Sequence, residues 1–216
     1  QICQRCVMDT SDPEIVFNQD GFCNHCEMFF QEAKIIKPDG DERERQLNNI
    51  ISSIKESGKN NKYDCLIGLS GGTDSSYVAY IVKDLGLRPL AVHMDNGWNS
   101  ELAQNNIANL VRKLDIDLYT HVINWTEYRD LMQAFFDADV VDIELLYDNA
   151  LQGVNYQQAS KFGLNYILSG VNKSSEGMLM PRSWHAFKFD KRNIKSIARK
   201  YKSIQLDSFP SFGTLD

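Results

Sequence analysis

The chain lacks any long uninterrupted hydrophobic run, and it contains only 5 prolines among 216 residues. Without an apolar stretch of about 20 residues, no membrane-spanning helix is expected. No signal-peptide pattern follows Gln1 either. These absences predict a cytoplasmic globular protein. The abrupt end at Leu215-Asp216 indicates a longer natural chain whose carboxyl-terminal part is missing.

Positive charge is also scarce. The chain carries 23 Lys and Arg against 29 Asp and Glu, which gives a formal net charge of −6. Proteins that bind nucleic acids usually present a basic surface to the phosphates. The acidic balance therefore argues against a broad nucleic-acid interface, and neither nucleic acid nor membrane is expected as a partner.

Cysteine is sparse, and four of the 5 cysteines form two CxxC pairs. Cys3 and Cys6 are separated from Cys23 and Cys26 by sixteen residues. Each pair places two thiolates on one side of a tight turn, and two such turns complete the tetrahedron of a structural Zn²⁺ site. An iron–sulfur cluster or a redox dithiol is the alternative, and His25 is an alternative ligand.

The most informative stretch is Asp64–Tyr80. An apolar strand, Cys65–Leu69, runs through Gly71 and Gly72 into a helix that is expected to begin near Asp74. A helix amino terminus offers unpaired N–H groups and a positive dipole end, and glycines let the backbone approach an anion closely. No lysine follows the glycines, so this is not the GxxxxGK[ST] loop. The stretch predicts a phosphate-binding loop of another type.

The predicted loop consists of Ser70, Gly71, Gly72, Thr73, Asp74, Ser75 and Ser76. Its serine hydroxyls add hydrogen-bond donors to the backbone N–H groups. Asp74 is unusual, because a carboxylate beside a phosphate repels it unless a cation lies between them. Asp74 is therefore expected either to help hold Mg²⁺ on the phosphates or to cap the helix.

Downstream of this loop, apolar strands alternate with amphipathic helices. Further strands are expected at Pro89–Met94, Leu118–Ile123 and Tyr166–Ser169. This alternation is typical of an α/β fold with a doubly wound parallel sheet, in which ligands lie beyond the carboxyl ends of the strands. Asp95 and Gly170 follow two of these strands, so both are expected beside the same crevice as Ser70. His93, inside a strand, is expected to be packed rather than catalytic.

Three parts are expected along the chain: a zinc-binding module at 1–35, a linker helix at 36–60 and a nucleotide-binding domain at 61–216. The linker helix has apolar residues at i, i+3, i+4 and i+7, namely Leu47, Ile50, Ile51 and Ile54. A later helix, from Thr126, is expected to bury the stripe Leu131, Met132, Phe135 and Phe136.

A second polar loop, Gly170–Gly177, follows the last strand of the predicted sheet. Glu176 is predicted to hold a second Mg²⁺ and Lys173 to neutralise a phosphate; the alternative is that both are surface residues. With Asp74, these two residues form the predicted catalytic set.

The string SGGTDSS at Ser70–Ser76 resembles the SGGxDS signature of the PP-loop ATP pyrophosphatases. Members of this superfamily cleave ATP to AMP and pyrophosphate while adenylating a carbonyl oxygen. The resemblance implies ATP as cosubstrate and the PP-loop type of adenine-nucleotide fold. It also implies that Asp95 borders the adenosine.

Four segments together resemble the N-acetyl sugar amidotransferases, which act in bacterial surface-polysaccharide synthesis, such as that of lipopolysaccharide and O-antigen. They are residues 3–13 and 21–26, the SGGTDSS loop, and SGVNKSSEG at 169–177. The resemblance implies that ATP adenylates a sugar N-acetyl oxygen, which ammonia then replaces to give an acetamidino sugar. A partner glutaminase, with a cyclase-like subunit beside it, would supply the ammonia, because the chain shows no glutaminase domain of its own.

Two alternatives remain open. A tRNA thiolase of the PP-loop class would need catalytic cysteines near the loop, and outside the CxxC pairs the chain has only Cys65. A non-catalytic zinc adaptor that merely binds nucleotide would release no pyrophosphate with any amide acceptor. The complete loop with Asp74 argues against the adaptor.

Overall fold

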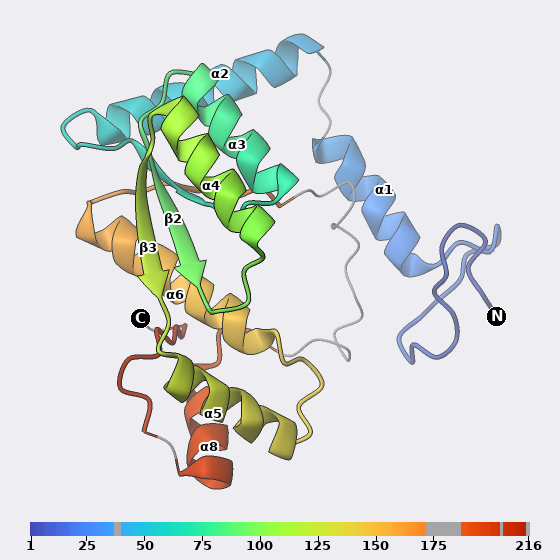
Figure 1. Ribbon diagram of the computed structural model, residues 1–216. Coiled ribbons are helices and arrows are strands. Elements are labelled where there is room, and N and C mark those ends of the chain that lie inside the picture. The colour runs from blue at the N-terminus through green and yellow to red at the C-terminus, as the bar shows by residue number, and fades with distance from the viewer. Residues whose placement is uncertain (37–39, 172–186, 204, 215–216) are drawn as a thin grey trace. The chain divides into compact units, whose positions relative to one another are not determined.

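The computed structural model of the chain describes residues 1–36, 40–171, 187–203 and 205–214 (Figure 1). These residues form two compact units. The first consists mainly of residues 1–50, and the second of residues 51–170 with 187–214. None of the helices in the described ranges combines the length and the apolar character needed to cross a membrane.

The helices and strands follow the alternation that the sequence predicts. They are α1 (Asn24–Ile36), α2 (Gly40–Gly58), β1 (Cys65–Gly68), α3 (Thr73–Asp84), β2 (Pro89–Asp95), α4 (Glu101–Leu114), β3 (Asp117–Val122), α5 (Trp125–Asp137), α6 (Leu145–Lys161), β4 (Ile167–Leu168) and α8 (Lys191–Lys202). Helix α1 is the element that the sequence pattern did not predict, because it begins inside the second CxxC pair, which reads locally as a turn.

The four strands form one parallel sheet in the order β3-β2-β1-β4. Leu66 in β1 pairs with Leu90 in β2 on one side and with Ile167 in β4 on the other. This arrangement confirms the predicted α/β fold with a parallel sheet. The chain builds the sheet outward from β1 to β3 and then returns to add β4 on the opposite side of β1. The reversal creates a topological switch point between β1 and β4, where open α/β sheets bind ligands.

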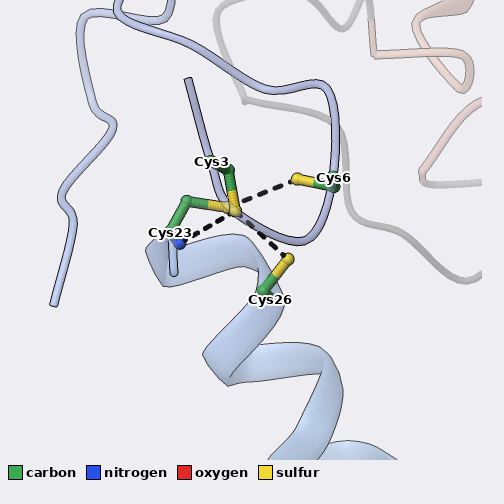
Figure 2. A group of neighbouring side chains, drawn as sticks. All are labelled: Cys3, Cys6, Cys23 and Cys26. Atoms are coloured by element: carbon green, nitrogen blue, oxygen red, sulfur yellow. Dashed lines mark hydrogen bonds between the residues drawn. The ribbon is translucent and has the colours of Figure 1, made fainter. Parts of the chain in front are cut away.

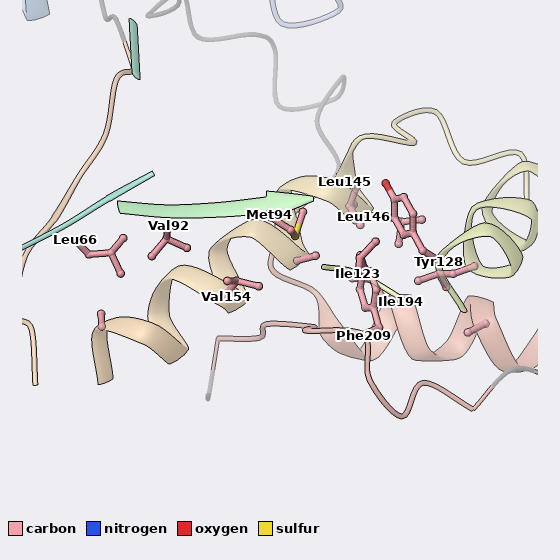
Figure 3. Close-up of a cluster of buried hydrophobic side chains, with 14 of the residues drawn as sticks. Leu66, Val92, Met94, Ile123, Tyr128, Leu145, Leu146, Val154, Ile194 and Phe209 are labelled. Carbon is pink, nitrogen blue, oxygen red and sulfur yellow. The ribbon is translucent and has the colours of Figure 1, made fainter. Parts of the chain in front are cut away.

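Both faces of the sheet are covered by apolar side chains. Leu66, Val92 and Met94 belong to a core cluster that includes residues of α5, α6 and α8 (Figure 3). Neighbouring residues of the same strands, Cys65 and Ile67, pack with residues of α2, α3 and α4. Because successive side chains of a strand point to opposite faces and both faces are covered, β1 is a continuous apolar run and β2 is apolar except for His93 and its last residue, Asp95.

The stripe predicted for α5 is only partly correct. Leu131 and Phe135 are buried in the core, and Met132 packs against it. Phe136, however, is 62% exposed. A helix turns by 100° per residue, so Phe136 lies outside the arc of α5 that faces the core cluster.

An ion pair between the buried Asp64 and the half-exposed Arg88 joins the amino ends of β1 and β2. The Asp64 carboxylate accepts hydrogen bonds from the Arg88 backbone N–H at 2.9 Å and from Arg88 Nε at 3.2 Å. The guanidinium also donates to the carbonyl oxygens of Asn61 and Gly58, each at 2.9 Å. The hydrogen bonds to Asp64 raise the pKa of Arg88. One side chain therefore ties the end of α2 to the start of both central strands.

We expect Asp64→Asn to lower the free energy of unfolding by about 1.5–3 kcal/mol, because it removes charge-assisted hydrogen bonds at a buried position. Urea unfolding with a constant m-value would measure the loss. Asp130→Asn is the matched control, because Asp130 pairs with Arg129 at the surface. That pair is expected to contribute less than about 1 kcal/mol. Equal losses in the two variants would contradict the structural role given to Asp64.

Candidate phosphate-binding site and metal centre

The predicted phosphate loop lies at the carboxyl end of β1, at the switch point of the sheet. The chain turns at Ser70 after the strand, and α3 begins at Thr73, with Gly72 as its N-cap residue. Because Gly72 occupies the N-cap position and Asp74 lies two residues further into the helix, the alternative in which Asp74 caps the helix is wrong. Asp74 instead lies exposed in the first turn of α3. The amino terminus of α3 therefore presents uncapped backbone N–H groups with a carboxylate beside them.

Hydrogen bonds within the loop hold its shape. The Ser70 backbone N–H donates to Ser75 Oγ at 3.2 Å, and the two hydroxyl oxygens lie 3.0 Å apart. The Gly72 carbonyl accepts from the hydroxyls of Ser75 and Ser76, at 3.2 Å and 2.7 Å. In this structure the serine hydroxyls are therefore engaged in the loop itself, and a direct bond from them to a phosphate stays a prediction.

Gly71 allows the loop to pack against the start of α4. Its φ of +79° lies in the left-handed region, and a Cβ atom added there would lie 2.4 Å from the Ala103 carbonyl oxygen. Asn106 Nδ2 donates to the Gly71 carbonyl at 3.1 Å. Only glycine satisfies both the conformation and the close approach. Gly72 differs, with a φ of −81° and its nearest added-Cβ contact at 3.4 Å.

The end of β4 meets the same loop from the other side. A Cβ atom on Gly170 would lie 3.0 Å from the Asp74 carbonyl carbon and 3.0 Å from the Ser75 nitrogen. The structure thus brings together Gly170 and the first turn of α3, as expected for two neighbours of one crevice. Lys173 and Glu176, the other residues predicted for this crevice, lie outside the described residues.

The carboxyl ends of β1 and β2 are joined through His93, which is buried as expected. His93 Nδ1 donates to the Leu69 carbonyl at 2.8 Å, because that oxygen can only accept. The Nε2 atom therefore accepts from Asn99 Nδ2 at 3.2 Å. Asn99 Nδ2 also donates to Asp95 at 3.0 Å, and the Gly97 N–H donates to Asp95 at 2.9 Å. Sequence reasoning missed this link, and its signal was a histidine at a core position of an otherwise apolar strand.

The four paired cysteines converge, although the two CxxC pairs lie far apart in sequence (Figure 2). Their sulfur atoms all lie within 4.8 Å of one another. The sulfurs of Cys3 and Cys26 are 3.8 Å apart, and those of Cys6 and Cys23 are 3.7 Å apart. A tetrahedral ZnS₄ centre with Zn–S bonds of about 2.3 Å has sulfur–sulfur edges of about 3.8 Å. The four thiols therefore fit a structural zinc ion.

Backbone and side-chain donors surround these sulfurs. The Cys23 N–H donates to Cys3 Sγ at 3.3 Å, and Arg5 donates to Cys26 Sγ at 3.5 Å. Burial alone would raise the pKa of Cys3, but backbone N–H groups, including that of Cys6, lower it to about 6. Burial raises the pKa of Cys6 to about 12. A bound zinc ion would deprotonate all four thiols.

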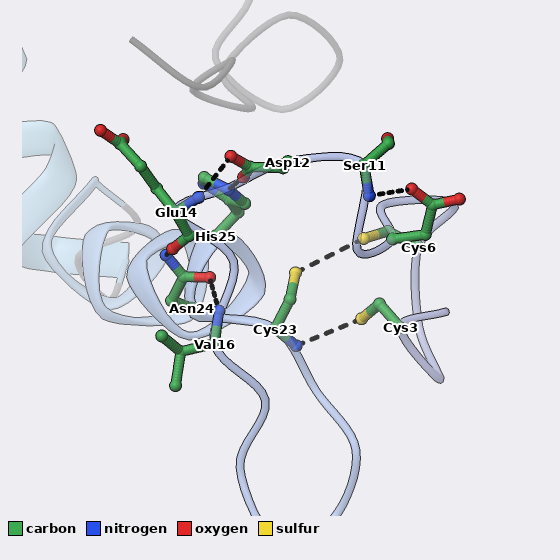
Figure 4. A network of polar contacts seen from close by, with 10 residues as sticks. Cys3, Cys6, Ser11, Asp12, Glu14, Val16, Cys23, Asn24 and His25 are labelled. Atoms are coloured by element: carbon green, nitrogen blue, oxygen red, sulfur yellow. Dashed lines mark hydrogen bonds and ion pairs between the residues drawn. The ribbon is translucent and has the colours of Figure 1, made fainter. Parts of the chain in front are cut away.

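His25 makes a structural hydrogen bond and does not belong to the sulfur cluster. Its Nε2 donates to the buried Asp12 carboxylate at 2.7 Å, and the Glu14 N–H donates to the same carboxylate at 2.9 Å (Figure 4). The bond from His25 and then that from Glu14 lower the pKa of Asp12. Among the described residues, the group able to hold a metal contains the four cysteines and not His25.

Gly71→Ala and Gly72→Ala add the same methyl group at two neighbouring glycines of the phosphate loop that differ in backbone conformation. We expect Gly71→Ala to reduce the free energy of unfolding by about 1–3 kcal/mol, because it forces a left-handed alanine against Ala103. Gly72→Ala should change it by less than about 1 kcal/mol. Thermal unfolding followed by circular dichroism measures both, and equal stabilities would refute the packing described for Gly71.

The purified protein is expected to contain one zinc ion per chain, and Cys6→Ser is expected to lose it, because three thiolates cannot complete the tetrahedron. Elemental analysis after dialysis measures the metal directly. Cys65→Ala is the control, because Cys65 lies in β1 and apart from the cluster. Iron in place of zinc, or full zinc content in Cys6→Ser, would reject this assignment.

Several known proteins are similar to this chain. An uncharacterized protein of Methanocaldococcus jannaschii is 25% identical over 215 residues, which cover 94% of this chain and 72% of that protein. The tRNA(Ile)-lysidine synthase of Chlamydia trachomatis is 29% identical over 130 residues, which cover 60% of this chain and 36% of the synthase. The chain thus spans only about a third of that enzyme.

Among solved structures, the glutamine-dependent NAD⁺ synthetase of Acinetobacter baumannii in complex with ADP aligns with a TM-score of 0.47 and 23% identity. The alignment covers 58% of this chain and 24% of that one. The family model described as NAD synthase matches residues 44–179, which include every strand of the sheet and the phosphate loop. Because the match covers more than half of the sequence, this chain belongs to the NAD synthase family.

Proposed function

We propose that the protein is an ATP-dependent amidotransferase that acts on a sugar N-acetyl group in lipopolysaccharide or O-antigen biosynthesis. Membership of the NAD synthase family and the resemblance of the SGGTDSS loop to PP-loop ATP pyrophosphatases support the ATP half of this reaction. The CxxC pairs, with the segments around them, support the sugar half through their likeness to the N-acetyl sugar amidotransferases.

The observation that carries the proposal is the geometry at the switch point. Uncapped N–H groups of α3 lie at the carboxyl end of β1, and Gly170 packs against the same turn. Such groups bind phosphate oxygens and stabilise the negative charge that develops as pyrophosphate leaves. An amide oxygen is a poor leaving group, so its conversion to a phosphate ester is the step that this arrangement favours.

The proposed reaction balances in two steps. The N-acetyl oxygen attacks the α-phosphorus of ATP, the amide N–H proton is lost, and pyrophosphate leaves to give an O-adenylyl imidate. Ammonia then adds to the imidate carbon, the C–O bond breaks, and AMP departs with the oxygen. The product is an acetamidino sugar, and the chain contributes positioning and electrostatic stabilisation.

Two metals accompany this proposal. Mg²⁺ on the phosphates would be held by Asp74, which is exposed and has no hydrogen-bond or ion-pair partner in the described ranges, together with Glu176. When bound, Mg²⁺ would neutralise the charge on the phosphate oxygens. Zinc, held by the four cysteines, would be structural, because four thiolates leave no open position for substrate.

Ammonia is proposed to come from a partner glutaminase with a cyclase-like subunit beside it. An ammonium salt can replace this partner in the test. The protein, ATP, Mg²⁺, an ammonium salt and a nucleotide-linked diacetamido uronic acid are incubated together and analysed by mass spectrometry. The proposal requires an amide oxygen to be exchanged for NH, with stoichiometric AMP and pyrophosphate. AMP without this mass change would show that the acceptor is wrong.

A second candidate is modification of tRNA. It is favoured by the similarity to tRNA(Ile)-lysidine synthases and by the basic residues of α8, such as Arg192, Lys195 and Arg199. The thiolase version fits less well, because Cys65 is fully buried in β1 and burial raises its pKa to about 12. Pyrophosphate release that depends on added tRNA, and not on the sugar, would favour this candidate.

Asp74→Asn should reduce pyrophosphate release by at least about 100-fold, because it removes the carboxylate proposed to hold Mg²⁺ against the phosphates. Zinc content should not change, since the cysteine cluster lies in the other unit. Asp84→Asn, at the far end of α3, is the matched control and should retain wild-type turnover. Wild-type turnover in Asp74→Asn would remove the catalytic assignment of this loop.

A further inference from the structure

A cavity of about 340 Å³ lies beyond the carboxyl end of β2, on the side of α5 and α6. The loop after β2 contributes Asn96, Trp98 and Asn99. Helix α5 contributes Tyr128, and the start of α6 contributes Tyr147 together with Glu144, the residue just before the helix. All these residues belong to the larger unit. The volume falls within the range of small-ligand pockets. Neither the zinc cluster nor the phosphate loop uses this cavity.

The Trp98 ring forms one side of it. Trp98 is 68% exposed, and its ring meets that of Trp125, itself 43% exposed, edge to face with centroids 5.7 Å apart. The Trp125 ring in turn packs against the Tyr128 ring, with centroids 6.4 Å apart, and the backbone of Gly97 lies close to the Trp125 ring. Large aromatic side chains are rarely left exposed together without a binding role. The Trp98 ring therefore contacts the Trp125 ring and remains largely exposed.

The remaining lining combines the apolar side chains of Met132 and Ile143 with polar and acidic side chains. Glu144 is exposed, and its carboxylate makes no hydrogen bond or ion pair within the part of the chain that the structure describes. Both N–H bonds of Asn99 are committed to His93 and Asp95, which leaves its carbonyl oxygen to accept. Carboxylate and amide groups suit the hydroxyls and N–H groups of a ligand.

We propose that this cavity binds the pyranose ring of the sugar substrate, with the apolar C–H face of the ring on Trp98 and its hydroxyls on Glu144, Asn96 and Asn99. This inference rests on the proposed function and names the substrate subsite of the same crevice. A pyranose has an apolar face and a polar rim, and the cavity offers one aromatic face and a set of polar side chains that match it.

The position of the cavity suits the reaction. Asn99, which lines it, is joined through His93 to the Leu69 carbonyl, one residue before the phosphate loop at Ser70. Neighbouring strands lie about 4.8 Å apart, so the ends of β1 and β2 open onto one crevice. In this proposal, a sugar stacked on Trp98 directs its N-acetyl group toward ATP held at Ser70–Ser76.

The first test compares Michaelis constants in the mass-spectrometric assay. We expect Trp98→Ala to raise the KM for the sugar by about tenfold and to leave the KM for ATP within about twofold, because the ring contacts the sugar alone. Trp98→Phe should recover part of the loss. Phe136→Ala, which removes an exposed ring of α5 outside the cavity, is the matched control. An unchanged sugar KM, or a raised KM for ATP alone, would overturn the proposal.

The second test measures binding without turnover. The nucleotide-linked diacetamido uronic acid is titrated into the wild type and into Trp98→Phe, and tryptophan fluorescence is recorded, with the free nucleotide as comparison. A sugar-dependent change in fluorescence that is absent from Trp98→Phe supports sugar binding in the cavity. If this change is seen but no amidation occurs, only the proposed function fails. Turnover by the wild type with no effect of the Trp98 variants would reject the cavity and leave the proposed function standing. Equal signals from sugar and free nucleotide would also reject it.

Discussion

The structure depends on the double burial of β1. This strand pairs with β2 on one edge and β4 on the other, and its residues Cys65, Leu66 and Ile67 are fully buried against helices on both faces. Polar chemistry can therefore appear only where the strand ends. At its amino end the chain uses the Asp64–Arg88 pair, and at its carboxyl end it uses the phosphate loop. A rigid strand thus supports a site made of loops, which is a common division of labour in α/β proteins.

Close backbone approach joins the loops of this site. Gly71 lies against the start of α4, and Gly170 lies against the first turn of α3. His93 adds a hydrogen-bonded bridge from the end of β1 to the loop after β2. These contacts connect the Ser70–Ser76 loop with the loop after β2, and the proposed catalysis would benefit from such preorganisation. The cavity and the phosphate loop would then serve the sugar and the ATP of a single reaction.

The cysteine cluster belongs to the amino-terminal unit. Its sulfur–sulfur distances of 3.7 and 3.8 Å match a tetrahedral zinc site, and the buried Asp12–His25 hydrogen bond packs beside it. Few apolar side chains are buried in this cluster, so a bound zinc ion would contribute more to its stability than a hydrophobic core.

Local patterns in the sequence were sufficient to predict many of these elements. The strands and helices of the larger unit, the glycine loop and the CxxC pairs follow from spacing and turn chemistry, which act over a few residues. The position of β4 beside β1, the approach of Gly170 to α3, the exposure of Phe136 and the unpredicted helix α1 did not follow from it. The sequence allowed Asp74 either to cap α3 or to bind a metal, and the backbone geometry shows that Gly72 is the N-cap residue. The cavity at Trp98 draws on three separate segments. Strand pairing and side-chain convergence are contacts between residues distant in sequence, so only the tertiary structure decided them.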